Sequence, residues 1–280
     1  MDHSHVTKYQ GSSSSSASIN ASVFQGSAVG PPFFVVNGTD LKPRHAQNCI
    51  DKYADDSYLI VPACNDHSAV SELLSVELWA SNNNLKLNRA KSQEMIICSS
   101  KKFKRDSVIL LPEIARVYSI KILGVTLDEN LSVKTHVAEV CQTAAQSLYA
   151  IKLLKSHGLD TLSNYDVCSA TVVSFLTYAS PAWWGFTTAE DRQRLQATVN
   201  RAIRWGFYGK TDPTIEQLCA KRHTDLYAKV RNNPVHVLHQ FLPPKRVLPY
   251  NLRLMGHQRE LPDKSGPFAD KTFFNRLLYQ

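Results

Sequence analysis

Two adjacent carboxylates, Asp55 and Asp56, are the side chains of this sequence best suited to chemistry. They end the tetrapeptide Tyr53-Ala54-Asp55-Asp56, which lies between the short apolar stretches 49–50 and 58–61, and this pattern predicts the tip of a β-hairpin. Hard divalent cations prefer oxygen ligands and tolerate clustered negative charge. Metal ions held in this way can clamp the attacking and leaving oxygens of a phosphoryl transfer. The alternative is a solvated turn, because Asp-Asp pairs are common in turns.

Other blocks of sequence accompany this tetrapeptide in a fixed order. Upstream lies the glycine-containing segment Gln25-Gly26-Ser27, and downstream come residues 84–92 and 122–128. Later blocks follow at 176–183, 200–204, 233–238 and 275–279. In this order the blocks resemble reverse transcriptases, the RNA-directed DNA polymerases, of non-LTR (LINE-like) retrotransposons. Motifs B, C, D and E of the polymerase palm would be followed by the thumb.

The resemblance implies roles for the hairpin tip. Asp55 and Asp56 would be metal-binding and catalytic residues with Mg²⁺ as the cofactor, and Tyr53 would belong to the nucleotide and template site. The implied reaction is a two-metal nucleotidyl transfer, in which a primer 3′-hydroxyl attacks the α-phosphate of a deoxynucleotide. An RNA template and a DNA primer are the implied partners.

Two further segments acquire roles from the same resemblance. Gln25, Gly26 and Ser27 would lie beside the incoming nucleotide and template, where a glycine allows close approach of the backbone and a helix start favours phosphate. Lys91 resembles the lysine of motif D, which is proposed to protonate the leaving pyrophosphate. The alternatives are an ordinary glycine turn before a helix and a surface lysine after one.

One part of the family pattern has no counterpart in this sequence. In the family, motif A precedes motif B by several tens of residues and carries another metal-binding aspartate, whereas residues 1–17 contain Asp2 as their single acid. We therefore expect an N-terminally truncated fragment that binds Mg²⁺ weakly and is inactive as a polymerase. A non-catalytic nucleic-acid-binding fragment is the alternative function, and an unrelated helical structural protein is a third.

Arginines on one side of a predicted helix over residues 189–206 suggest a second functional surface. Arg194, Arg201 and Arg204 fall near one side, and the apolar positions fall on the other. In a polymerase thumb such a stripe contacts the phosphate backbone of nucleic acid. A solvated charged face is the alternative.

Composition and charge are those of a folded chain with an acidic partner. The 280 residues are 43% hydrophobic, enough for a substantial core, and the net charge of +8 makes nucleic acid the leading partner. The six cysteines have no Cys-x-x-Cys spacing and are expected to be reduced thiols. We expect no signal peptide and no membrane span, because the longest apolar stretch, 172–186, is short and interrupted. These features favour an intracellular protein, cytoplasmic or nuclear, and do not indicate an oligomeric state.

The predicted fold class is α+β: a partial palm, with a small antiparallel sheet and helices, followed by a mainly α-helical thumb. The expected divisions are a disordered Ser-rich leader (1–18), the partial palm (19–131), the thumb (132–232) and an irregular C-terminal tail (233–280).

Local patterns predict the individual elements. In the palm region we expect a helix beginning near Pro31, hairpins over 47–62 and 117–127, a helix capped by Asn65-Asp66, and a short strand over 93–97. The helix capped by Asn65-Asp66 should bury Val70, Leu73, Leu74 and Leu78. In the thumb region we expect a long helix from 133 to a left-handed cap at Gly158, helices over 162–179 and 189–206, and shorter ones beyond Pro213.

Overall fold

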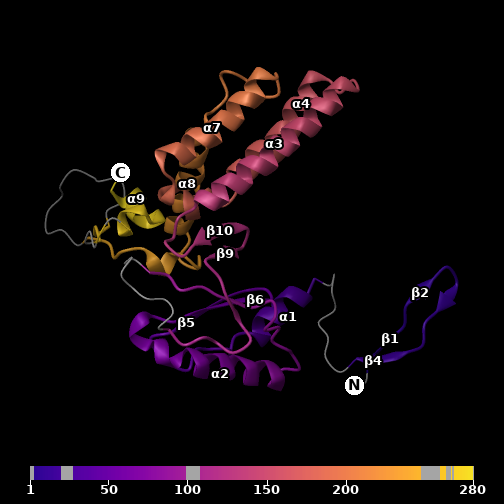
Figure 1. Ribbon diagram of the computed structural model, residues 1–280, viewed down its shortest axis with the longest axis vertical. Coiled ribbons are helices and arrows are strands. Elements are labelled where there is room, and N and C mark those ends of the chain that lie inside the picture. The colour runs from indigo at the N-terminus through magenta and orange to yellow at the C-terminus, as the bar shows by residue number, and fades with distance from the viewer. Residues whose placement is uncertain are drawn as a thin grey trace. The chain divides into compact units, whose positions relative to one another are not determined.

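The computed structural model describes residues 3–19, 28–98, 108–246, 259–262, 266 and 268–279 (Figure 1). It forms two compact units. The first unit comprises Met1–Glu94 and Lys102–Val117, and the second comprises Met95–Lys101 and Tyr118–Gln280. Helices and small, mostly antiparallel two-stranded sheets make up the described residues, so the expectation of a mixed α and β chain is confirmed.

The N-terminal segment of the first unit differs from the expected disordered leader. Its strands form two antiparallel pairs, β1 with β4 and β2 with β3. Their bounds are β1 His3–His5, β2 Lys8–Tyr9, β3 Ser12–Ser13 and β4 Ala17–Ile19. Gln10 (φ 45°) and Gly11 (φ 81°) close the ribbon with two left-handed residues, the conformation that tight hairpin turns require. Composition alone predicts disorder, whereas the left-handed turn at Gln10 and Gly11 favours pairing of the flanking strands.

The described residues in the rest of the first unit form two α-helices, a 3₁₀ turn, a hairpin and a short parallel strand pair. Their bounds are α1 Gly30–Asn37, β5 Cys49–Tyr53, β6 Asp56–Ile60, the 3₁₀ turn η1 Ala63–Ser68, α2 Ala69–Asn82, β7 Gln93–Glu94 and β8 Ala115–Arg116. The helix near Pro31 and the hairpin around Asp55-Asp56 are confirmed. The strand expected over 93–97 is shorter, and it pairs in parallel with β8.

Helix α2 corrects two details of the prediction. It begins at Ala69 and not after Asn65-Asp66, because those two residues lie in η1, where Asn65 departs from helical geometry (φ −126°). Leu73 is buried as expected, whereas Leu74 and Leu78 are exposed. The apolar stripe read from the sequence is therefore only partly used for packing within the described residues.

The second unit begins with a hairpin and continues as a helical bundle. Its main elements are β9 Ser119–Ile122, β10 Val125–Asp128, α3 Lys134–Ser156, α4 Thr161–Cys168, the π-helical turn η3 Ser169–Val173, α5 Ser174–Leu176, α6 Ser180–Trp183, η4 Trp184–Phe186, α7 Ala189–Arg204 and α8 Ile215–Asn232. The short elements η5 His239–Phe241, η6 Ala269–Lys271 and α9 Phe273–Leu278 follow. Helices α3, α4 and α7 lie side by side in this bundle (Figure 1).

Helix boundaries in the second unit follow the sequence signals closely. Gly158 has φ 98°, which confirms its left-handed position after α3. A capping box of Thr188 and Asp191 starts α7. A second box, formed by Thr214 and Gln217, starts α8, which runs for 18 residues and is longer than expected.

One apolar core extends through the second unit. Its most deeply buried side chains include Val133, Val137, Leu148, Leu176, Trp183, Leu195, Val199 and Phe207. Trp183 and Trp184 both belong to this core, where their large rings bury much apolar surface. In the described part of the chain, no helix is long and apolar enough to cross a membrane.

Candidate functional site

The two carboxylates lie at the tip of the β5–β6 hairpin. Tyr53 pairs with Asp56 as the last rung of the ladder, so Ala54 and Asp55 form a two-residue turn. Tyr53, Asp55 and Asp56 are all exposed, and Tyr53 keeps 64% of its surface. Neither aspartate forms an ion pair with another described residue. Both carboxylates are thus available to an external cation, and Mg²⁺ characteristically uses one or two carboxylates together with substrate phosphates.

The first of the two turn residues, Ala54, has a strained backbone conformation. Ala54 has φ 49°, in the left-handed region that only glycine enters without steric cost. Strained backbone persists where the surrounding structure enforces it, and six other described non-glycine residues, among them Leu123 in the β9–β10 turn, share the left-handed conformation. The hairpin register imposes this geometry directly beside the two carboxylates.

Strand alternation adds one acid that the sequence reading missed. Asp51 pairs with Tyr58, and Tyr53 pairs with Asp56, so these four residues share one face of the ribbon. The hydroxyl of Tyr58 donates a hydrogen bond to Asp56 Oδ2 at 3.4 Å. The alternation of residues 51, 53, 56 and 58 across a two-residue turn was the signal for this grouping. Within the described residues, no group of three or more His, Cys, Asp or Glu side chains is arranged to hold a metal ion.

A buried carboxylate fixes the chain that leads into β5. Glu72 of α2 is fully buried and accepts hydrogen bonds from the backbone N–H groups of Arg44 (2.9 Å) and His45 (2.8 Å). The amide of Asn48, one residue before β5, donates a third bond at 2.8 Å. Burial opposes ionisation of Glu72, but these three hydrogen bonds outweigh it and lower its pKa.

The same buried cluster contains two more polar side chains, Ser68 and Asn65. The Asn48 amide also donates to Ser68 Oγ at 3.0 Å, and the Asn65 amide donates to Asn48 Oδ1 at 2.8 Å. Sequence reasoning missed this cluster, which we call the Glu72 cluster (Asn48, Asn65, Ser68 and Glu72). An acid next to Leu73 on the buried side of an amphipathic helix was its only sequence signal.

Lys52 ties the hairpin to the end of α1. Its ammonium donates to the carbonyl oxygens of Gly38 and Leu41, the second at 2.8 Å. A cation near the carboxyl end of a helix also interacts favourably with the helix dipole. The β5–β6 hairpin therefore has two anchors, Lys52 and the Glu72 cluster, and its acidic tip projects beyond them.

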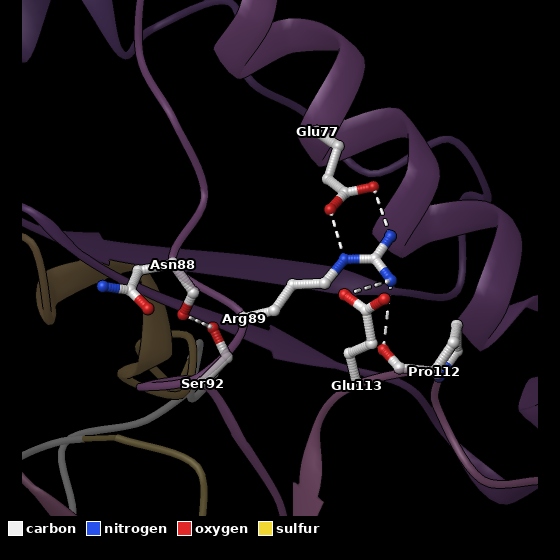
Figure 2. A network of polar contacts seen from close by, with 6 residues as sticks. All are labelled: Glu77, Asn88, Arg89, Ser92, Pro112 and Glu113. Atoms are coloured by element: carbon white, nitrogen blue, oxygen red, sulfur yellow. Dashed lines mark hydrogen bonds and ion pairs between the residues drawn. The ribbon is translucent and has the colours of Figure 1, made fainter.

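Lys91 lies in a tight turn that follows α2. Its backbone N–H donates to the carbonyl oxygen (3.1 Å) and to Oδ1 (3.2 Å) of Asn88, and its side chain is exposed. Ser92 Oγ donates to the Asn88 carbonyl oxygen at 2.9 Å (Figure 2). Among the described residues, neither a hydrogen bond nor an ion pair links Lys91 to Asp55 or Asp56. The structure thus places the three residues in one unit without direct contact. Gln25, Gly26 and Ser27 lie outside the described residues.

The predicted basic stripe occupies the exposed side of α7. Arg194, Arg201 and Arg204 are exposed, whereas the opposite side of the helix is buried in the core through Leu195, Val199 and Ala202. Arg204 also lines a shallow groove of about 560 Å³ together with Ala197, Asn200, Ile203 and Lys210.

Two lysines of α3 extend the positive charge near the end of α7. Lys155 Nζ donates to the carbonyl oxygen of Trp205 at 3.2 Å. Lys152 Nζ lies 5.4 Å from the centre of the Trp205 ring. Periodicity within α7 alone did not reveal these lysines, because they come from another helix.

Comparison with known proteins gives no family assignment. No family model matches the sequence, and no curated protein or solved structure is significantly similar to it.

Proposed function

We propose that this chain is part of an RNA-directed DNA polymerase of the non-LTR retrotransposon type, with residues 19–131 in the palm and residues 132–232 in the thumb. The β9–β10 hairpin would then belong to the palm in sequence, although it packs with the second unit. The observation that carries the proposal is the pair Asp55 and Asp56, exposed and without cationic partners among the described residues at a strained two-residue hairpin tip. Hard oxygen ligands in this arrangement suit Mg²⁺.

In the polymerase family that the chain resembles, the reaction extends a primer by one deoxynucleotide, and the residues of this chain would supply part of that site. Asp55 and Asp56 would hold Mg²⁺, which supplies charge stabilisation for the attacking and leaving oxygens when it is bound. Tyr53, on the same face of the ribbon as Asp56, would contact the nucleotide and template. Lys91 would donate a proton to the pyrophosphate as it leaves, which is general acid catalysis.

Primer extension tests this proposal directly. The chain is incubated with a DNA primer annealed to an RNA template, deoxynucleotides and Mg²⁺, and compared with the Asp55→Asn, Asp56→Asn double variant. Asp66→Asn is the control, because Asp66 is also exposed and lies in η1 of the same unit. We expect no extension by the chain alone, because the motif A aspartate of the family has no counterpart in this sequence. Extension that is lost in the double variant and kept in the control would show instead that another acid supplies the missing ligand. Extension that persists in the double variant would contradict the assignment.

Nucleic-acid binding without catalysis is the second candidate function. It is favoured by the exposed arginines of α7 and by Lys152, Lys155 and Lys210, because none of these cations pairs with a carboxylate in the described part of the chain. Unpaired cations from two helices and a loop favour a polyanionic partner.

The salt dependence of nucleic-acid binding distinguishes phosphate contacts made by α7 from a general attraction between a basic protein and a polyanion. Binding of the primer–template duplex is measured over a range of salt concentrations for the parent chain and for the Arg201→Ala, Arg204→Ala variant. Loss of two phosphate contacts should reduce the slope of log affinity against log salt by about 2. Lys221→Ala removes an exposed charge from α8 and is the control. Binding without extension would support the second candidate, and equal slopes in all variants would exclude α7 as the binding surface.

A further inference from the structure

Arg89 joins three segments of the first unit: helix α2, its own turn and the turn at Pro112 and Glu113 (Figure 2). Its guanidinium donates two hydrogen bonds to the carboxylate of Glu77 on α2, Nε to Oε1 at 2.5 Å and Nη2 to Oε2 at 2.6 Å. The third nitrogen, Nη1, donates to the carbonyl oxygen of Pro112 at 3.1 Å and lies 3.8 Å from Glu113 Oε2. Arg89 itself belongs to the turn that carries Lys91.

The geometry of the Arg89–Glu77 pair is that of a strong interaction. Two parallel N–H···O bonds between guanidinium and carboxylate fix both the distance and the angle between the groups. The Arg89 and Glu77 side chains retain only 20% and 28% of their exposure, which limits competition from water. The hydrogen bonds from Arg89 lower the pKa of Glu77, which favours the ionised carboxylate that the pair requires.

Apolar packing does not anchor the turn at residues 88–92 in place of the Arg89–Glu77 pair. None of residues 85–92 is buried, although two leucines lie in this stretch. The local hydrogen bonds from Lys91 and Ser92 to Asn88 shape the turn but do not attach it to the rest of the unit. Arg89 attaches the turn to α2 on one side and to the turn at Pro112 and Glu113 on the other, and the pairing of β7 with β8 holds the chain directly after Ser92.

We propose that Arg89 is a positioning residue, which fixes the turn at residues 88–92 and thereby holds the Lys91 ammonium at a constant place in the unit. The use of Lys91 as a proton donor to pyrophosphate rests on the proposed function, whereas the positioning by Arg89 rests on the contacts of Figure 2. Glu77 is the essential partner, and Glu113, which is 78% exposed, contributes little.

Hydrogen exchange at single amides tests the positioning. In Arg89→Gln and in Glu77→Gln, the amides of Lys91 and Ser92 should exchange about tenfold faster than in the parent chain, because the turn opens locally. Arg89→Lys keeps the charge without the two-pronged geometry and should give an intermediate rate. Glu113→Gln should stay within about twofold of the parent, since exposed pairs contribute little.

A matched control separates local positioning from general destabilisation. Arg116 and Glu94 form another partly buried arginine–glutamate pair in the same unit, with Nε to Oε2 at 2.8 Å. Arg116→Gln should accelerate exchange at Val117, whose N–H donates to the Glu94 carbonyl oxygen, more than at Lys91. Equal exchange at Lys91 in Arg89→Gln and the parent would overturn the proposal. Equal acceleration throughout the first unit would overturn it as well.

A chemical probe reports the Lys91 side chain. Pyridoxal 5′-phosphate and borohydride label accessible lysines, and labelling of Lys91 is measured with and without added pyrophosphate. At a temperature well below the melting temperature of every variant, we expect protection by pyrophosphate in the parent that is lost in Arg89→Gln and retained in Glu113→Gln. Protection that persists in Arg89→Gln would overturn the proposal. Absence of protection in the parent would instead contradict the role of Lys91 under the proposed function, and amide exchange would still decide the role of Arg89.

Discussion

In the first unit, polar and apolar side chains are buried in similar numbers among the described residues, whereas in the second unit the buried side chains are largely apolar. Among the described residues, Leu41, Leu73 and Ala80 are the buried apolar side chains of the first unit, beside the four members of the Glu72 cluster. In the second unit one apolar core runs from β10 through the helices to α8. The first unit also leaves several large apolar side chains exposed, among them Phe33, Val36 and Leu78.

This difference indicates what each unit depends on. Burial of apolar surface is non-directional and tolerates small shifts, whereas buried hydrogen bonds and ion pairs stabilise only when every partner is in place. We therefore expect the first unit to open more easily than the second and to respond more sharply to loss of a single polar atom. The proposed catalytic residues lie in this first unit, and the proposed phosphate-binding residues lie on the second.

The largest expected effect is in the apolar core. Leu148 of α3 is fully buried, so Leu148→Ala should lower the free energy of unfolding of the second unit by about 2–5 kcal/mol, through lost burial and the cavity left behind. Leu153→Ala, on the same helix but with 51% of the side chain exposed, is the control and should cost much less. Urea denaturation followed by the helical circular dichroism signal measures both. Similar costs for the two variants would contradict a core centred on α3.

Acid should weaken the second unit before it weakens the first. His223 is buried, and burial, assisted by the nearby charge of Arg276, lowers its pKa from 6.5 to about 4. The unfolded chain therefore binds the proton more readily, and stability falls as the pH drops from 6.5 to 4, by up to about 3 kcal/mol.

Denaturation at a series of pH values checks the role of His223. His223→Leu should remove most of this pH dependence, and a smaller slope should remain from His136, whose pKa is also lowered by burial. An unchanged slope in His223→Leu would show that other groups cause the acid sensitivity.

The Glu72 cluster gives the corresponding test in the first unit. Glu72→Gln keeps the size of the side chain but removes the charge that three donors share, and should cost about 2 kcal/mol. The native pKa of Glu72 is lowered, so its stabilisation is complete above its ordinary value of 4.5 and is lost as the pH falls below that value. Amide exchange of Asn48 and Cys49 at pH 7 and pH 4 measures the effect. Asp66→Asn, at an exposed acid, should change neither rate.

The elements that repeat a local pattern were the ones predicted from sequence. Helices α3 and α7 have long apolar stripes and clear ends, and the β5–β6 and β9–β10 hairpins have apolar strands around tight turns. The predictions that differ from the structure depended on tertiary contacts. Leu74 and Leu78 have helical spacing but nothing described covers them, and the residues that bind Glu72 are scattered from Arg44 to Asn48 without a repeating interval.

The candidate site shows the same limit. Asp55, Asp56 and Lys91 were found because their residue types suggest chemistry, and the structure places them on a hairpin tip and on a tight turn. Asp51, Glu72 and Arg89 were missed because their contribution is a position in a register or a contact with a distant segment. Sequence patterns of short range do not contain that information.

The smallest expected effect compares the tips of the two hairpins. In the first unit, Ala54 occupies a left-handed position at φ 49°; in the β9–β10 turn of the second unit, Leu123 takes the equivalent position at φ 46° and Gly124 follows at φ 87°. Ala54→Gly should raise the stability of the first unit by about 0.5 kcal/mol, since relief of the strain slightly exceeds the entropy that glycine loses on folding.

The opposite exchange in the second unit completes this test. Gly124→Ala should lower the stability of the second unit by about 1 kcal/mol, because the new side chain takes a left-handed φ. Its Cβ would also lie 3.2 Å from Tyr178 Cε1, on the residue whose hydroxyl donates to the Leu123 carbonyl oxygen. Thermal melts of the two variants and the parent measure whether each substitution raises or lowers stability. Destabilisation by Ala54→Gly would show that the alanine backbone is not strained at the acidic tip.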